Sequence, residues 1–181
     1  MKPTYRRLPH IYIIGRPLFI TYRLHGSLPP GRHFDRKSLT SGQAFLHLDQ
    51  LLDSESCGPL YLKMPNIAAI VANSIHQGSG SEYNLHAWVI MPNHVHLLLT
   101  PISNVSKFLQ RLKGASALQA NQQLGLLHKP FWQTESYDRL VRDNSEFKRV
   151  TNYIVQNPVK AGLVASQQQY PWSSAWPTAL C

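Results

Sequence analysis

Two histidines separated by a single residue are the first side chains whose types and spacing indicate a chemical function. His94 and His96 stand in the run MPNHVHLLL, residues 91–99. Successive side chains of a strand point to opposite faces, so we expect both imidazoles on one face and residues 95, 97 and 99 in a core on the other. Two imidazoles side by side form a two-point clamp for a metal ion. The alternative interpretation is an exposed polar face that carries histidine twice, and the apolar residues around the pair disfavour it.

Other chemistries that use closely spaced histidines or cysteines do not match the sequence. A histidine-triad nucleotide hydrolase needs a third histidine at position 98, which is a leucine, and the zinc-protease motif HExxH is absent. A structural zinc site requires cysteines or further histidines nearby. The two cysteines, Cys57 and Cys181, form no CxxC motif. We interpret both as reduced thiols of a cytoplasmic protein.

A second group of chemically capable residues lies in the run VTNYIVQNPVKAG, residues 150–162. Tyr153 and Asn157 are four residues apart and Arg149 lies four residues before Tyr153, so one face of a helix carries all three. A tyrosine, a neutral oxygen ligand and a cation on one stripe suit attack on a phosphodiester. The alternative is that Tyr153 is a core aromatic and that Asn157 caps the helix before Pro158.

The elements that must position these residues follow from periodicity and turn signals. The hydrophobic pattern predicts strands at 18–25, 83–90, 94–100 and 137–142, and helices at 41–54, 65–77, 104–124 and from about 145 to 157. In the first helix the apolar stripe is residues 44, 48, 51 and 52, and Pro158 is expected to end or kink the last helix. The fold class is therefore α+β, a ferredoxin-like β-α-β-β-α-β sandwich with a C-terminal helix that carries Tyr153. We expect one domain, 1–181, with a core at about 17–164 and an irregular tail at 165–181.

The charge of the chain indicates a polyanionic partner. Its 181 residues include 18 Lys and Arg against 9 Asp and Glu, a net charge of +9 with a pI near 9.8. The basic residues are spread along the chain, which favours nucleic acid over a membrane surface. No uninterrupted apolar stretch of about 18 residues is present, so no membrane-spanning helix is expected. Residues 11–20 are broken by Arg16 and Pro17 and do not match a signal peptide.

Five segments together carry a resemblance to a known family. They are FITYRLHGSLP, MPNHVHLLL, FWQTESYDRLVRD, YIVQNPVKAGLV and YPWSS, in this order along the chain. In this combination the sequence resembles the REP-associated tyrosine transposases, which belong to the single-tyrosine HUH transposase superfamily. The resemblance extends over about residues 17–174. The joint occurrence of the HUH motif and the Tyr-x-x-x-Asn-Pro block makes it specific.

The resemblance implies a function and a set of site residues. His94 and His96 match the metal-binding histidines, Tyr153 the nucleophile and Asn157 the third ligand. Gln156 stands where many relatives carry histidine, so it competes with Asn157 for that role. The implied cofactor is a divalent metal, Mg²⁺ or Mn²⁺, and the implied substrate is single-stranded DNA with a hairpin. The implied activity is nicking and strand transfer at hairpin-forming repeats through a 5′-phosphotyrosine intermediate.

Contacts with DNA would come from basic and aromatic side chains. The basic candidates are Lys107, Arg111, Arg139, Arg142, Lys148, Arg149 and Lys160. Trp132 is a candidate for base stacking and equally for the core. We expect a cytoplasmic, nucleoid-associated protein, with a homodimer and a monomer both compatible with the sequence.

The sequence bears differently on four other classes of protein. A domesticated DNA-binding protein that no longer cleaves stays open, although the presence of His94, His96 and Tyr153 favours the enzyme. An RNA binder of the same fold is disfavoured because the strands show no RNP-type aromatic motif. Relaxases usually place the tyrosine before the histidines, and the flanking segments resemble the transposases more than replication initiators.

Overall fold

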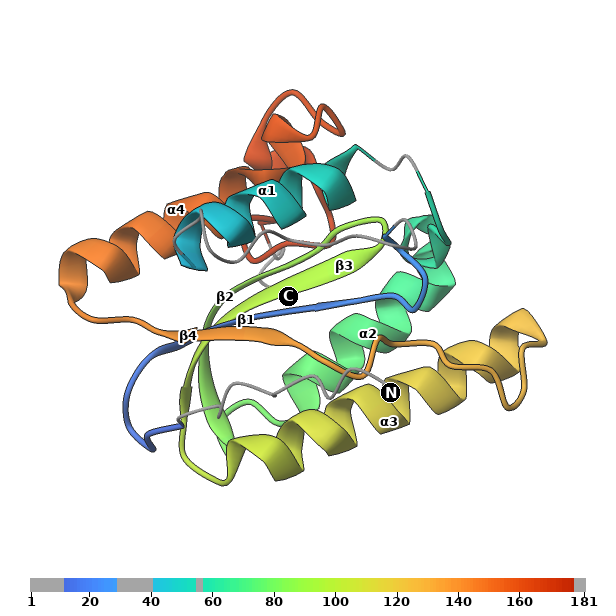
Figure 1. The fold of residues 1–181 in the computed structure, drawn as a ribbon, viewed down its shortest axis with the longest axis horizontal. Coiled ribbons are helices and arrows are strands. Elements are labelled where there is room, and N and C mark those ends of the chain that lie inside the picture. The colour runs from blue at the N-terminus through green and yellow to red at the C-terminus, as the bar shows by residue number, and fades with distance from the viewer. Residues whose placement is uncertain (1–11, 29–40, 55–56, 178–181) are drawn as a thin grey trace, which may run out of the picture.

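A four-stranded antiparallel sheet forms the centre of the molecule (Figure 1). The computed structural model describes residues 12–28, 41–54 and 57–177. The strands, in the spatial order β2-β3-β1-β4, are β1 (Leu18–Arg23), β2 (Tyr83–Ile90), β3 (His94–Pro101) and β4 (Tyr137–Leu140). This order, with helices in the connections from β1 to β2 and from β3 to β4, is the ferredoxin-like arrangement, so the predicted fold class is confirmed.

The four α-helices of the described residues cover both faces of the sheet (Figure 1). On one face lie α1 (Ser41–Asp53) and α4 (Asn144–Lys160), and on the other lie α2 (Pro65–Gln77) and α3 (Val105–Leu124). Two short 3₁₀ turns, η1 (Tyr61–Lys63) and η2 (Gln167–Gln169), complete the described elements. The connection from β1 to β2 thus contains α1 and α2, which serve opposite layers.

The central strand β3 separates two hydrophobic cores. Its residues Val95, Leu97 and Leu99 pack into the core beneath α2 and α3, whereas Leu98 packs into the core beneath α1 and α4. The alternation of side chains along a strand therefore places His94 and His96 on the α1/α4 face, as the sequence predicts. Because β3 pairs with β2 and with β1, this site lies at the middle of the sheet and not at an edge.

Local signals account for most element boundaries. The bounds of α2 and β2 are those expected, and Asn104 caps α3 by accepting a hydrogen bond from the Lys107 amide at 3.0 Å. Gly125 follows α3 with a φ of 67°, the left-handed conformation that glycine adopts most easily at a helix end. Asp143 caps α4 through the Glu146 amide at 2.8 Å.

The expected inward stripe of α1 is wrong by about one residue. Phe45, Asp49 and Leu52 are the buried residues of the helix that the structure describes, at 8%, 4% and 1% exposure, whereas Leu48 and Leu51 are half-buried. The spacing of the three buried residues is still helical, but the middle position holds an acid. A stripe chosen by apolar residue type alone therefore missed the inward face.

Two features of the C-terminal part go beyond what the sequence predicts. The helix α4 does not end at Pro158 but runs to Lys160. A proline near the last turn removes only one backbone hydrogen bond. The backbone amides of Ala161 and Leu163 still donate to the carbonyl oxygens of Asn157 and Pro158, each at 2.9 Å. The tail is not irregular throughout, since η2 forms within it. Its segment 172–174 also pairs with β2, where the Ile90 amide donates to the Trp172 oxygen at 2.8 Å.

Two sequence expectations outside the sheet can be placed as well. Cys57 is a free, half-buried thiol, whereas Cys181 lies outside the described residues. Among the helices that the structure describes, none combines the length and apolar character needed to cross a membrane.

Candidate active site

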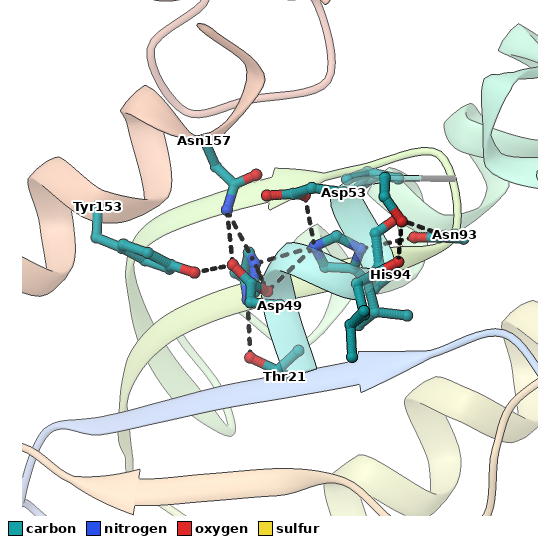
Figure 2. A network of polar contacts seen from close by, with 12 residues as sticks. Thr21, Asp49, Asp53, Asn93, His94, Tyr153 and Asn157 are labelled. Atoms are coloured by element: carbon teal, nitrogen blue, oxygen red, sulfur yellow. Dashed lines mark hydrogen bonds and ion pairs between the residues drawn. The ribbon is translucent and has the colours of Figure 1, made fainter. Parts of the chain in front are cut away.

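Side chains from four elements meet on the α1/α4 face of the sheet (Figure 2). The strand β3 contributes His94 and His96, β1 contributes Thr21, α1 contributes Asp49, and α4 contributes Tyr153 and Asn157. Both histidines are fully buried, at 0% exposure, which excludes an exposed polar strand face as the reason for the pair. A buried polar group needs a partner, so the geometry of this cluster decides its chemistry.

His94 is held in one tautomer by the residue before it. The Asn93 amide nitrogen donates to the Leu52 carbonyl at 2.9 Å, so its Oδ1 faces His94 Nδ1 at 2.7 Å and must accept. His94 Nδ1 therefore carries the proton, and its Nε2 presents a lone pair to the cluster. Burial lowers the pKa of His94 to about 3, with a further lowering from His96 and an opposing effect from Asp49. The ring is neutral at physiological pH, the form that binds metals.

His96 is oriented in the same manner from the opposite side. Its Nδ1 lies 2.7 Å from the Thr21 hydroxyl, which sits across the ladder in register with it. A hydroxyl can accept from Nδ1–H, and His96 Nε2 then points to His94 Nε2 at 3.1 Å. Partners of this kind commonly fix the ring orientation of metal-binding histidines.

Asp49 completes a group of three electron-pair donors. Its Oδ1 lies 3.1 Å from His96 Nε2 and 3.5 Å from His94 Nε2, and it receives no hydrogen bond from any described residue. The ligand atoms of Asp49, His94 and His96 all lie within 4.8 Å of one another. Two lone pairs and a carboxylate that face each other repel, and a divalent cation among them removes the repulsion. The donor set, two imidazoles and a carboxylate, fits such an ion.

Asp49 is ionised despite its burial. Burial raises its pKa, but the neighbouring imidazoles of His96 and His94 and the hydrogen bond from the Asn157 amide outweigh this effect, so the pKa of Asp49 lies below its ordinary value. Sequence reasoning missed Asp49. The available signal was its position between Phe45 and Leu52 on the helical stripe, where an acid in place of an apolar residue indicates a function. One turn further along α1, Asp53 Oδ1 lies 3.8 Å from His94 Nε2.

Tyr153 and Asn157 share one face of α4, as the sequence predicts, and both reach Asp49 Oδ2 (Figure 2). The Tyr153 hydroxyl donates to this oxygen, and the Asn157 amide nitrogen lies 3.3 Å from it and 3.3 Å from His96 Nε2. Asn157 Oδ1 is buried and receives no hydrogen bond from a described residue. Turning the amide over would exchange its nitrogen and oxygen and place the oxygen at the donor group. The Asn157 side chain therefore lies in this cluster and does not cap the helix.

Gln156 is not brought into this group. Its amide nitrogen donates to Gln167 Oε1 of η2 at 3.0 Å, so the side chain ties α4 to the C-terminal segment. Between the two candidates for the third ligand, the structure places Asn157 beside His96 and Gln156 elsewhere.

The basic candidates divide between the two layers of the molecule. On α4, Lys160 Nζ lies 5.1 Å from the centre of the Tyr153 ring, Arg149 lines a cavity together with Tyr153, and Lys148 is exposed. Arg139 and Arg142 both pair with Glu146, at 2.9 Å and 3.0 Å, beside the same cavity.

The remaining candidates lie in the other layer. Lys107 and Arg111 belong to α3, which covers the opposite face of the sheet from the histidines (Figure 1). Arg111 forms an ion pair with Glu82. Trp132 is 7% exposed and donates to Ser116 at 3.0 Å, so it is a core residue.

Comparison with known proteins identifies a matching family, curated relatives and a solved structure of similar fold. Residues 68–157 match the family described as "Transposase IS200 like", a range that includes both histidines, Tyr153 and Asn157 but not Asp49. The REP-associated tyrosine transposase of Escherichia coli (strain K12) is 28% identical over 92 residues, which are 51% of this chain and 54% of the relative. A similarly described Haemophilus influenzae protein is 29% identical over 96 residues, 47% of this chain and 54% of its own.

A solved structure shows the same fold. It is a REP-associated tyrosine transposase bound to a REP hairpin, with a TM-score of 0.63, 20% identity, and coverage of 93% of this chain and 81% of the other. The family match and the curated relatives together indicate a transposase-type protein. The chain belongs to the family of IS200-like transposases. Its matches span about half the length of the curated relatives.

Proposed function

We propose that the chain is a metal-dependent enzyme that nicks single-stranded DNA at hairpin-forming repeats and transfers the strand through a 5′-phosphotyrosine at Tyr153. The observation that carries this proposal is the meeting of the Tyr153 hydroxyl with the donor group of Asp49, His94 and His96. A nucleophile beside a preformed cation site is what attack on an anionic phosphodiester requires. The relatives named REP-associated tyrosine transposases, one of them bound to a REP hairpin, support the same substrate class.

The residues that would hold the ion are His94, His96, Asp49 and Asn157. Mg²⁺ or Mn²⁺ held there supplies Lewis-acid stabilisation of the charge on the scissile phosphate. Asn93 keeps His94 in the tautomer that presents Nε2, and the Thr21 hydroxyl orients the ring of His96.

Tyr153 and Asp49 perform the covalent step. The hydrogen bond to Asp49 Oδ2 aims the phenol oxygen at the donor group and provides an acceptor for its proton. As the bond from the tyrosine oxygen to phosphorus forms, the bond from phosphorus to the 3′ oxygen breaks, and this oxygen takes up a proton from solvent to become a free 3′-OH. The phosphotyrosine keeps the energy of the original bond, so a second 3′-OH can reverse the step on another strand without ATP. The sequence accordingly carries no P-loop.

The basic side chains near Tyr153 indicate a path for the DNA strand. Lys148, Arg149 and Lys160 on α4, together with Arg139 and Arg142, lie on the same layer as the tyrosine and suit its phosphates. Contacts with Lys107 and Arg111 require DNA that also passes around the sheet to α3.

The test is formation of a covalent protein–DNA adduct. The protein is incubated with Mg²⁺ or Mn²⁺ and a synthetic single-stranded hairpin DNA copied from the surroundings of its own gene, and adducts are detected on denaturing gels. Tyr153→Phe should bind this DNA but form no adduct, because only the nucleophilic oxygen is lost. Tyr137→Phe is the matched control and should behave like the wild type. An adduct that persists in Tyr153→Phe would move the nucleophile elsewhere, and binding without any adduct in the wild type would favour a non-cleaving DNA-binding protein.

A further inference from the structure

A cavity of about 390 Å³ opens beside Tyr153, between α1, α4 and β4. The hydroxyl of Tyr153 belongs to the donor group, while its side chain also forms part of the cavity lining. Whatever occupies this cavity therefore lies next to the phosphate that Tyr153 would attack. Its volume falls within the roughly 300–1,000 Å³ of sites that bind small molecules.

One wall of the cavity is aromatic. The rings of Phe45 and Tyr137 are stacked, with centroids 4.5 Å apart and an angle of 26° between their planes. Phe19 packs against Phe45 at 5.3 Å and against Tyr153 at 6.1 Å, which extends the wall to the nucleophile. Tyr137 and Tyr153 are half-buried, so parts of this wall are accessible. Such a surface stacks nucleobases of any type, because every base has a flat apolar face.

Another part of the cavity lining is positively charged. Arg139 and Arg142 share the carboxylate of Glu146, whose side chain is 3% exposed, and Arg149 adds a third guanidinium. Burial raises the pKa of Glu146, but the hydrogen bonds from Arg142 and the charge of Arg139 outweigh it, so this pKa stays low and Glu146 ionised. Three guanidinium groups against one carboxylate leave two positive charges. The side chain of Arg142 is 75% exposed, which leaves it accessible to an anion.

We propose that this cavity binds one unpaired nucleotide adjacent to the phosphate that Tyr153 attacks. The base lies against the wall of Phe45 and Tyr137, and the phosphate of this nucleotide lies against Arg142 and Arg149. A paired base inside a duplex has its faces covered by its neighbours, so only an unpaired or extruded base can use the wall. The inference rests on the proposed function and adds to it a protein pocket that reads the single-stranded flank of the cleavage position.

The test combines DNA that lacks single bases with protein variants that lack an aromatic side chain. In the hairpin oligonucleotide used for adduct formation, each nucleotide flanking the cleaved phosphate is replaced in turn by an abasic analogue. One position should lower kcat/KM for adduct formation roughly 5- to 150-fold, the range that stacking of one base supplies. Tyr137→Leu should lower kcat/KM on intact DNA by a similar factor and should be insensitive to the abasic change at that position. Tyr137→Phe, which keeps the aromatic ring, should restore both the kcat/KM on intact DNA and the sensitivity to the abasic position.

Two matched variants separate this role from general effects. Tyr61→Leu removes a half-buried tyrosine that stacks on Phe131 outside this cavity, and it should keep full sensitivity to the abasic position. Arg149→Gln, a change on the surface, should make the fall of log affinity with log salt shallower by about 0.7, the value for one phosphate contact on a single strand. Lys129→Gln, at a separate cavity against α3, should leave the slope unchanged.

The outcomes distinguish this inference from the proposed function. Adduct formation in which no abasic position changes kcat/KM more than twofold would overturn the pocket and leave the enzyme intact. Absence of any adduct in the wild type would overturn the proposed enzyme, and the pocket is then decided by affinity alone, measured by fluorescence anisotropy with the same oligonucleotides. Equal affinities for all oligonucleotides of the abasic series would then overturn the nucleotide pocket. The abasic series and Arg149→Gln keep the inference testable if Tyr137→Leu fails to fold.

Discussion

Asp49→Asn is the substitution that tests the metal site most sharply, because it removes one charge and keeps the shape of the side chain. Asp49 Oδ1 lies 3.1 Å and 3.5 Å from the two Nε2 atoms, so the carboxylate is the anionic member of the donor group. Even partners outside the ligand set commonly change metal affinity 10- to 100-fold, so we expect the loss of this ligand to raise the Kd for Mn²⁺ about 100-fold or more.

The expected change in stability follows from linkage. At a Mn²⁺ concentration 100 times its Kd, the wild type gains ~2.7 kcal/mol of stability, whereas a variant with a 100-fold higher Kd gains ~0.4 kcal/mol. For a chain of this size, 1 kcal/mol corresponds to roughly 2–4 °C in Tm. The rise in Tm on adding Mn²⁺ should therefore fall from roughly 5–11 °C in the wild type to roughly 1–2 °C in Asp49→Asn.

Calorimetric titration with Mn²⁺ and thermal unfolding with Mn²⁺ or excess chelator measure both quantities. Asp53→Asn is the matched control, since it removes the same charge one turn further along α1, with its oxygen 3.8 Å from His94 Nε2 and its side chain 21% exposed. Its effect should be much smaller. If Asp49→Asn binds Mn²⁺ as tightly as the wild type, Asp49 is no ligand and acts only on Tyr153.

Three further substitutions test other parts of the account. Asn93→Ala should weaken Mn²⁺ binding about 10- to 100-fold, because His94 Nδ1 loses the acceptor that fixes its tautomer, and an unchanged Kd in calorimetry would contradict this. Gln156→Ala should change the Kd for Mn²⁺ less than twofold, since its side chain bonds Gln167, and a tenfold loss would restore it as a ligand. Burial and the nearby Arg23 lower the pKa of Lys113 to about 8, so the folded protein holds fewer protons there than the unfolded chain between about pH 8 and 10.5. The wild type should therefore gain stability relative to Lys113→Met as the pH rises through that window, measured by denaturant unfolding, and a parallel pH dependence of the two proteins would refute it.

The sequence predicts those parts of the fold that depend on neighbouring residues. The proline and glycine signals at the ends of α2 and the apolar alternation in β2 and β3 are local, and they give these elements and the hairpin between the strands. The stripe of α1 and the course of the tail depend on contacts with distant residues. Phe45 and Asp49 become inward-facing only because α4 and β3 pack against them, which no window of the sequence contains.

The candidate site divides in the same manner. His94 and His96 lie within three residues and Tyr153 and Asn157 within five, so periodicity alone places each pair on one face. Asp49 lies 104 residues from Tyr153 and Thr21 lies 75 residues from His96, and only the folded sheet brings them together. The ion pair of Arg139 with Glu146 likewise depends on the folded structure. Together with the ion pair between Arg142 and Glu146, it places both arginines in the lining of the cavity.

The central claim is that Tyr153 becomes covalently linked to DNA in a metal-dependent step. The most direct measurement is mass spectrometry of the digested wild-type protein after incubation with the hairpin DNA, once with Mn²⁺ and once with excess chelator. The account predicts a nucleotide attached through its 5′-phosphate to the peptide that contains Tyr153, present with Mn²⁺ and absent with chelator. A modified peptide containing Tyr137 instead, or an equal yield of the Tyr153 adduct in excess chelator, would contradict it.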